Sequence, residues 1–458
     1  MLIVAVVAIL AAAASRLWLL PVQFSADPNE GWNGFQAWHA MGAGPLYPPP
    51  GALTGNNYPP LSFYVVGALG RIVGDAILAG RMVALLSVVG IAATIFALLR
   101  RFGRSGFEGS VGVLLFLLLN ATVLRDYLAL NDPQWLGHLL IMVGVVLIVP
   151  QTPDDRPTAK RLVIASLFML QGGLIKINLI AWPLAATAWL GWYHRRSLLL
   201  WLAVGLCGAA VAVFICWVAF GPDFFTAMLT PRGYTISRIV HRGGGALLVT
   251  GPLLWWSWPF LAHPPEDRRL NLIRLAVLFS VVFGFLQRGG AGIHFNAHFE
   301  SAIALSISSA LAAGSRQNRA GRTAAVLGIA ALLAVGFGQE VRELRRFSAR
   351  QPAWLSMEQR IAAVPGEVAC ETQALCFWAG KRFAIDFFLY SQRAFQTGDS
   401  SALDRALAQR RFAAVEIDAD SPLGDRGPNA DPILLRLSQT MLPVFVDATG
   451  RQMLMPKR

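Results

Sequence analysis

The run LIVAVVAILAAAASRLWLLPV at residues 2–22 is followed closely by Asp27-Pro28-Asn29-Glu30. About 20 apolar residues are enough to cross the hydrocarbon core of a bilayer as a helix. Two carboxylates therefore follow the point where a membrane helix is expected to end. There they can accept a proton or hold a cation, and neither role is needed to keep the helix in the bilayer. The alternative is a solvated loop that only caps the helix.

The composition of the whole chain favours a membrane protein. It is 55% hydrophobic and 14% charged, whereas soluble domains have about 25% charged residues. The sequence therefore predicts an α-helical polytopic membrane protein with about 11 transmembrane helices, each able to span about 30 Å of hydrocarbon. The predicted spans lie near residues 2–21, 77–99, 109–124, 134–150, 161–176, 177–193, 197–219, 246–262, 270–286, 298–314 and 323–338.

The arrangement of basic residues predicts the orientation. Arginine and lysine cluster after every second predicted span, as at Arg100, Arg101 and Arg104. Such loops are cytoplasmic by the positive-inside rule, so the residue 27–30 loop and the C-terminal tail are expected outside. Residues 58–74, which begin Tyr-Pro-Pro and contain Arg71, are interpreted as a helix that only partly enters the membrane. No basic region precedes residues 2–22, so we expect a retained first helix rather than a cleaved signal peptide.

Charge and cysteine content narrow the possible partners. The net charge of +13 lies mainly on the membrane part, which suits anionic lipid head groups and phosphates. No soluble basic module is present to bind nucleic acid. Cys207 and Cys216 share one predicted span. Cys370 and Cys376 lie in the exterior tail, where a disulfide could form in an oxidising compartment, although their spacing alone does not establish one.

Two domains are expected. Residues 1–338 form a membrane-embedded domain whose first extracytoplasmic loop covers about 23–57. Residues 339–458 form a small extracytoplasmic α/β domain with strands at 366–370 and 413–417, a helix at 401–411 and a hairpin at 442–454. The tail has no catalytic signature, and we expect it to act as a docking surface or a lid over the membrane face.

The exterior loops supply candidate substrate contacts. Trp32, Phe35 and Trp38 recur every three residues, which is typical of an amphipathic helix on a membrane surface. Interfacial anchoring and sugar stacking both remain open for these rings. In the next exterior loop, Asp126 could serve a site or pair with Arg125. Asp132 could serve a site or cap the following helix.

Cationic residues on the same side suggest an anionic ligand. Lys176 lies between two apolar runs at the expected outer edge, where it either snorkels or meets a partner such as a phosphate. The loop at 221–245 has an unusual concentration of basic groups for an exterior segment, unless it is simply solvated. The glycine-rich stretch 288–300 mixes groups suited to phosphate contacts, and a His/Glu metal site is a second interpretation of it. The residues concerned are Arg232, Arg238, His241, Arg242, Arg288, His294, Asn296, His298 and Glu300.

In their order along the chain, these features resemble the GT-C superfamily of polytopic membrane glycosyltransferases, particularly bacterial protein mannosyltransferase-like and aminoarabinose transferase-like members. The resemblance rests on Glu30-Gly31-Trp32-Asn33, Leu46-Tyr47-Pro48, Asn57-Tyr58-Pro59-Pro60-Leu61, Asn131-Asp132-Pro133-Gln134, Lys176, the 294–300 stretch, and Trp378-Ala379-Gly380-Lys381 and Arg411-Phe412-Ala413-Ala414-Val415 in the tail. It covers essentially the whole chain, although each motif is short. The family often has adjacent Asp-Glu in the first loop, whereas Asn29 precedes Glu30 here, so the choice of catalytic carboxylate between Asp27 and Glu30 stays open.

The resemblance implies an inverting transferase of the bacterial cytoplasmic (inner) membrane. It would use a polyprenyl-phosphate-linked sugar on the extracytoplasmic side, among membrane lipids and toward an acceptor that is a lipid, glycan or protein. Its expected catalytic residues are Asp27, Glu30 and Asp132, which could also hold a divalent cation (Mg or Mn). Lys176, Arg242, Arg288, His294, Asn296 and His298 would bind the donor phosphate, and Trp32, Asn33, Tyr58 and Asp126 the substrate. The alternative is a flippase or transporter of lipid-linked saccharides that forms no bond.

Overall fold

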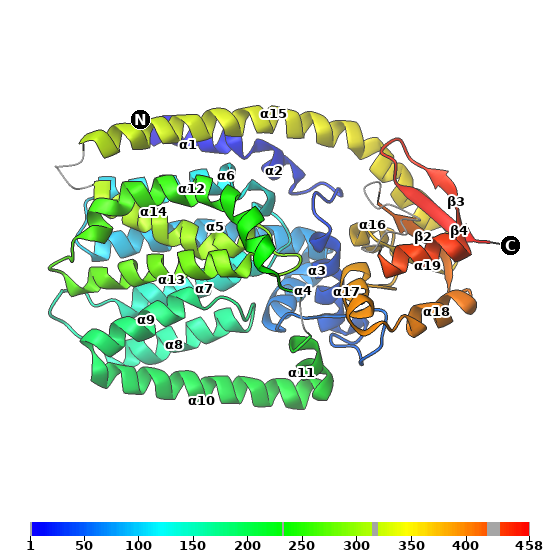
Figure 1. Cartoon of the computed structure of the whole chain (residues 1–458), viewed down its shortest axis with the longest axis horizontal. Coiled ribbons are helices and arrows are strands. Elements are labelled where there is room, and N and C mark those ends of the chain that lie inside the picture. Colours follow the sequence, from blue (N-terminus) through cyan, green and yellow to red (C-terminus); the bar gives the residue numbers. More distant parts are fainter. Residues whose placement is uncertain (1, 231–232, 314–318, 419–430, 458) are drawn as a thin grey trace. The chain divides into compact units, whose positions relative to one another are not determined.

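The computed structural model describes residues 2–230, 233–313, 319–418 and 431–457 (Figure 1). Helices dominate, and the described part contains one four-stranded sheet. The helices are α1 (Leu2–Ala12), α2 (Ala14–Leu19), α3 (Asn29–Trp38), α4 (Leu61–Val73), α5 (Ala76–Arg101), α6 (Gly106–Ala121), α7 (Gln134–Ile148), α8 (Ala159–Gly173), α9 (Ala181–Tyr193), α10 (Arg195–Phe220), α11 (Pro222–Met228), α12 (Ile236–Ala262), α13 (Asn271–Gln287), α14 (Phe299–Ala313), α15 (Arg319–Ala363), α16 (Gln373–Trp378), α17 (Phe387–Thr397), α18 (Ser401–Ala408) and α19 (Pro432–Thr440).

A helix lies at each of the eleven predicted spans. Among the described residues, three segments are long and apolar enough to cross a membrane by themselves: Ala76–Arg101, Arg195–Phe220 and Arg268–Gln287. The predicted total of about 11 crossings stays a prediction, because several helices are shorter than the roughly 20 residues a straight span needs. The partly inserted segment is helical as α4, and its depth in the membrane also stays a prediction.

The chain divides into two compact units, which are described separately. Unit 1 comprises residues 1–17, 82–216 and 232–340, and unit 2 comprises residues 18–81, 217–231 and 341–458. The tail, predicted as a separate domain, is grouped in unit 2 with residues 18–81, which include α4 and the loop predicted to be the first exterior one.

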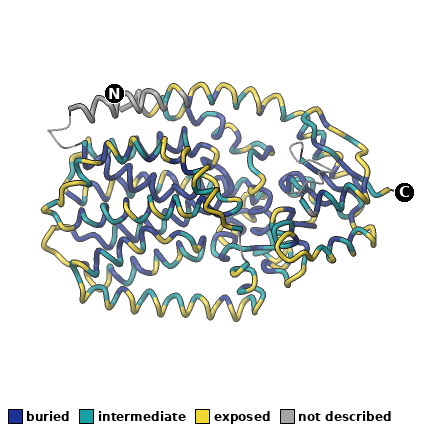
Figure 2. The backbone as a smooth tube through the Cα atoms, viewed as in Figure 1, coloured by how far each residue is buried: buried dark blue, intermediate teal, exposed yellow. Residues whose placement is uncertain are grey.

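Unit 1 is a set of packed helices. Its apolar core includes the stacked rings of Trp135 and Phe299, whose centroids lie 3.8 Å apart. Figure 2 shows buried residues concentrated on parts of α7, α9 and α13 and along nearly the whole of α14, whereas α10 is mostly intermediate or exposed along its length. An exposed apolar helix is expected where lipid replaces water as the solvent.

Local sequence fixes several helix ends. Ser105 and Glu108 form a reciprocal capping box at the start of α6. Thr158 and Thr235 cap α8 and α12 through their side-chain oxygens. In unit 2, Asp75 accepts bonds from the backbone N–H groups of residues 77 and 78 at the start of α5. Each side chain satisfies donors that a helix N-terminus leaves unpaired.

Unit 2 contains the sheet, with strands β1 (Glu367–Cys370), β2 (Phe412–Ile417), β3 (Met441–Val446) and β4 (Gln452–Pro456) in the order β1-β2-β4-β3. β1 and β2 are parallel, and the other pairs are antiparallel. The predicted strands, the helix at α18 and the hairpin are confirmed. Cys370 and Cys376 form a disulfide, which settles the alternative left open by their spacing.

The prediction of a surface helix around Trp32 needs correction. That helix exists as α3, but Trp32 and Phe35 are 9% and 6% exposed. Phe35 stacks on Phe383 with ring centroids 5.1 Å apart. The apolar face of α3 is therefore covered by other parts of unit 2 rather than free to lie on a membrane surface. Periodicity showed that one face of the helix is apolar, but it could not show what covers that face.

Candidate functional site

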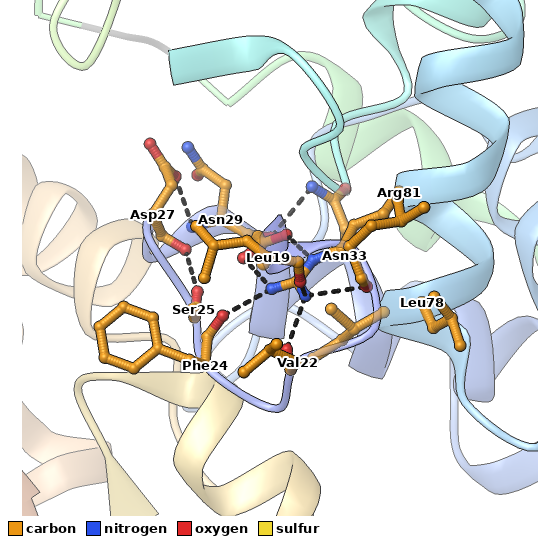
Figure 3. Close-up of polar contacts among 12 residues, drawn as sticks. Leu19, Val22, Phe24, Ser25, Asp27, Asn29, Asn33, Leu78 and Arg81 are labelled. Carbon is orange, nitrogen blue, oxygen red and sulfur yellow. Dashed lines mark hydrogen bonds and ion pairs between the residues drawn. The ribbon is translucent and has the colours of Figure 1, made fainter. Parts of the chain in front are cut away.

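Glu30 is held in a buried ion pair. Its carboxylate is 1% exposed and accepts from Arg81 Nε at 2.7 Å and from Arg81 Nη2 at 2.8 Å. The same guanidinium donates to the carbonyl oxygens of Leu19, Val22 and Phe24 (Figure 3). One arginine thus closes the loop that links α2 to α3, and both oxygens of Glu30 face that cation. A buried pair of this kind is costly to break, because either partner alone would be a desolvated charge.

Asp27 has a different environment. Its side chain is only partly buried, and its Oδ1 accepts a bond from Asn29 N at 2.8 Å. The Asp27 carbonyl accepts from Ser25 Oγ at 2.7 Å, which helps fix the loop. In Figure 3 the Asp27 carboxylate points away from the guanidinium of Arg81. Of the two acidic groups in this loop, Asp27 is the more exposed.

The predicted substrate residues of unit 2 lie behind this loop. The Trp32 indole N–H donates to Asp386 Oδ2 at 2.7 Å, and its ring packs edge-on against Tyr58 and Phe63. Burial raises the pKa of Asp386 to about 6, although its hydrogen bonds with Leu389 and Trp32 oppose the rise. Asn33 is buried and bonds back to Asn29 O. These contacts give Trp32 and Asn33 structural roles, and their direct contact with substrate stays a prediction.

In unit 1, Gln134 is the centre of a polar cluster. Its Oε1 accepts from Lys176 Nζ at 2.7 Å and from Asn296 Nδ2 at 3.1 Å. Its Nε2 donates to Asn296 O at 2.8 Å and lies 3.3 Å from His138 Nε2. The predicted phosphate contacts Lys176 and Asn296 are therefore brought together by a residue to which the sequence prediction gave no role. Lys176 is 7% exposed and does not extend freely into solvent.

Arg242 and Arg288 lie next to this polar cluster and, together with Lys176, are called the cationic cluster. Arg242 Nη1 and Arg288 Nη1 both donate to Ile293 O, at 3.2 Å and 3.4 Å. The Arg288 guanidinium lies 4.9 Å from the ring centroid of Phe295. Desolvation of the ring and the charges of Arg242 and Arg288 lower the pKa of His294, which favours its neutral form at pH 7. The segment 293–296 thus joins the arginine pair to the Gln134 cluster.

The remaining predicted site residues of unit 1 have hydrogen-bond, ion-pair or packing partners within that unit. Asp132 is 4% exposed, and its Oδ1 accepts from Gln134 N at 2.8 Å, which matches the helix-capping alternative. Asp126 pairs with Arg16 at 2.6 Å. Arg125, the partner considered for Asp126, instead contacts Glu340 at 2.9 Å. His298 packs against Phe285 with ring centroids 5.2 Å apart.

The residues proposed for a metal site do not form a ready set of ligands. The described residues contain no cluster of three or more His, Cys, Asp or Glu side chains suited to an ion. Glu300, considered with the nearby histidines, accepts from the backbone N–H groups of Ala181 and Trp182 and so caps α9. Glu30 turns both oxygens to Arg81. We therefore assign no chemical step to a metal ion, and a divalent cation stays a prediction. Arg232 lies outside the described residues.

Two important residues were missed from the sequence, although each had a signal. Arg81 is a charged residue inside the apolar run 77–99, where an ionisable group usually has a specific partner. Gln134 belongs to the motif Asn131-Asp132-Pro133-Gln134, in which the sequence prediction gave a role to the carboxylate of Asp132 and none to the amide. A cavity of about 480 Å³ in unit 1 is lined by residues such as Trp192, Arg274 and Val281 and includes no predicted site residue.

Comparison with solved structures defines the fold. No family model matches the sequence, and no curated protein matches it. The chain shares its overall fold with two membrane-enzyme structures, and the described residues contain three helices long and apolar enough to span a membrane.

The similar structures include ArnT from Cupriavidus metallidurans in the apo state, at 15% identity and a TM-score of 0.66 over 98% of this chain and 97% of that one. The same enzyme bound to undecaprenyl phosphate gives 14% identity and a TM-score of 0.64 over 98% and 96%. The Archaeoglobus fulgidus oligosaccharyltransferase tethered to an acceptor peptide gives 12% identity and a TM-score of 0.53 over 99% and 74%.

Proposed function

We propose that this protein is an inverting glycosyltransferase that takes a sugar from a polyprenyl-phosphate donor. The observation that carries the proposal is the clustering of Lys176, Arg242 and Arg288 through Gln134 and the 293–296 segment, in a chain with the GT-C fold. Cations gathered at the ends of apolar helices suit a ligand with an anionic head and a hydrocarbon tail. Undecaprenyl phosphate, the ligand of the similar ArnT structure, has this chemistry.

The proposal assigns the general base to Asp27. An acceptor hydroxyl attacks the anomeric carbon of the sugar, and its proton passes to the Asp27 carboxylate. Glu30 is unsuited to this role, because Arg81 binds both of its oxygens and leaves neither turned toward an acceptor. Its role is to hold the loop that carries Asp27.

The leaving group is the polyprenyl phosphate. As the bond between the anomeric carbon and the phosphate oxygen breaks, that oxygen keeps the electron pair and gains negative charge. The proposal assigns the stabilisation of this developing charge to Arg242, Arg288 and Lys176 of unit 1. Such preorganised cations favour the transition state over the ground state, because the charge they contact grows during the reaction.

The predicted location completes the proposal. Basic residues lie at the end of α5, after α9 and in the turn before α13. For α9 and α13, these are the ends opposite to those next to Lys176 and Arg288. The positive-inside rule would place these loops in the cytoplasm and the cationic cluster on the outer side of a bacterial cytoplasmic membrane. An external site suits lipid-linked sugars rather than cytoplasmic nucleotide sugars. The acceptor can be a lipid, glycan or protein.

The first experiment measures transfer of labelled sugar from a panel of polyprenyl-phosphate donors by the full chain in membrane vesicles. We expect Asp27→Asn to lower kcat by about 10²–10⁴-fold without a loss of thermal stability. Glu30→Gln should instead lower the apparent Tm, because it weakens the pair with Arg81. Asp154→Asn, at an exposed loop position, is the matched control and should behave as wild type.

The same experiment separates the enzyme from a flippase. Wild-type transfer with loss in Asp27→Asn supports the proposal, whereas equal transfer by both would exclude Asp27 as the base. If wild type moves a fluorescent lipid-linked saccharide across the vesicle membrane and forms no product with any donor, the transporter replaces the enzyme.

A further inference from the structure

Helix α16 fits closely against the helix that follows the Asp27 loop. A Cβ added to Gly31 of α3 would lie 2.0 Å from the backbone nitrogen of Ala374 in α16. One turn later, a Cβ on Gly34 would meet the Phe377 ring at 3.2 Å. Backbone can approach this closely only where a side chain is absent. The absence of side chains at Gly31 and Gly34 therefore allows α16 to pack directly against α3.

The last residue of α16 reaches the ion pair that organises the Asp27 loop. The indole N–H of Trp378 donates to Asp75 Oδ2 at 2.9 Å. The Arg81 guanidinium lies 5.8 Å from the centroid of the Trp378 ring, within the range of a cation–π contact. Asp75 in turn caps the start of α5, the helix that carries Arg81. Trp378 thus touches both the cation that closes the loop and the residue that begins its helix.

Covalent and polar bonds hold α16 in this position. The Cys370–Cys376 disulfide joins the end of β1 to the middle of α16. Within the loop it closes, Thr372 N donates to Glu416 Oε2 at 2.9 Å, and the Thr372 hydroxyl lies 3.2 Å from Asp418. The helix has only six residues, too few to be stable alone in water. Its position therefore depends on the disulfide and on the end of β2.

We propose that α16, closed by the Cys370–Cys376 disulfide, is a positioning element for the Asp27–Glu30 loop. The intact disulfide keeps Ala374 against α3 and Trp378 against Arg81, which orders the loop for the transfer reaction. Two-electron reduction to two thiols by an added dithiol, which itself becomes the disulfide, removes the link to β1 and loosens the packing of α16. The catalytic consequence rests on the proposed function, whereas the ordering of the loop does not.

The test uses the full chain with Cys207→Ser and Cys216→Ser, so that Cys370 and Cys376 are the remaining thiols. Amide hydrogen exchange of residues 24–33 is measured in the oxidised protein, after reduction, and in the Cys370→Ser/Cys376→Ser variant. We expect faster exchange in both disulfide-free samples and no further effect of reductant on the double variant. Unchanged exchange across residues 24–33 would overturn the proposal.

Kinetics then test the positioning role. A misplaced base should lower kcat by about 10²-fold with little change in the donor KM, because the proposed phosphate contacts lie in other segments. Trp378→Phe should retain most of the kcat that Trp378→Ala loses, since a phenyl ring preserves the contact with Arg81. Equal losses in these two variants, or losses matching only the folded fraction, would contradict positioning. If no donor supports transfer by wild type, the proposed function fails, and the exchange measurement still decides the coupling.

Discussion

At the scale of the residue, Arg81 shows how one side chain organises a loop without regular structure. Its guanidinium is 2% exposed and bonds both oxygens of Glu30 together with carbonyl groups of residues 19–24. Buried carbonyl oxygens need donors, and arginine supplies five N–H groups in one plane. Glu30 balances the charge. The pair therefore satisfies the loop's backbone and leaves Asp27 as its accessible acid.

Gln134 supports a prediction at the same scale. Gln134→Leu removes the acceptor that Lys176 Nζ and Asn296 Nδ2 share. We expect a stability loss of about 1–3 kcal/mol, the usual cost of removing a buried hydrogen-bond partner, and a higher donor KM. Thermal unfolding and donor titration measure the two effects. Gln151→Leu makes the same chemical change at an exposed position, and identical behaviour of the two variants would contradict the role of Gln134.

At the scale of the element, helix ends in the membrane part depend on contacts distant in sequence. α9 begins without a side-chain cap from its own N-cap residue, Ile180. Glu300, at the start of α14, accepts instead from Ala181 N at 3.1 Å and Trp182 N at 3.3 Å. A buried side-chain carboxyl group thus substitutes for a local cap, because unpaired buried N–H groups are costly.

This contact predicts the effect of two substitutions at Glu300. Glu300→Ala leaves the first N–H groups of α9 without their acceptor and should reduce stability by about 1–2 kcal/mol, the upper range for loss of a cap. Glu300→Gln keeps a side-chain oxygen at that position and should lie close to wild type. Apparent Tm of the full chain in detergent provides the comparison. A Gln variant as unstable as the Ala variant would show that charge, rather than capping, is what matters.

At the scale of the whole molecule, stability should depend on pH through unit 2. Burial raises the pKa of Glu416 to about 8 from its ordinary 4.5, against the opposing effect of Arg451. The folded chain therefore holds this proton where the unfolded chain has released it. Stability from this group is full below about pH 4.5 and falls as pH rises toward about 8, by a few kcal/mol at most.

Apparent Tm measured across this pH range tests the assignment. Wild type should lose stability as pH rises, and Glu416→Gln, which cannot ionise, should show a smaller decline. Glu367→Gln is the matched control, because its carboxylate is part-exposed and pairs with Arg411 at 2.8 Å. If Glu416→Gln follows the wild-type pH profile, another group is responsible for the dependence.

The sequence predicted more of the elements than of their contacts. Long apolar runs identified the helix at each expected span, and the short strand-like segments around Val368 and Val415 identified β1 and β2. Trp32 illustrates the limit. Its spacing with Phe35 showed an apolar face on α3, but burial of that face depends on α16, more than 300 residues away in the chain. Periodicity shows which face of a helix is apolar, but it does not show which segment packs against that face.

The sequence by itself determined the helical membrane class, the α/β tail and the set of charged residues available for a site, because hydropathy, turn signals and residue types are local properties. Only the tertiary structure decided which charges are partnered. It paired Glu30 with Arg81, Arg125 with Glu340 and Lys176 with Gln134, and it joined Cys370 to Cys376. Such pairings depend on distances of a few ångströms between segments far apart in the chain, which local sequence patterns do not specify.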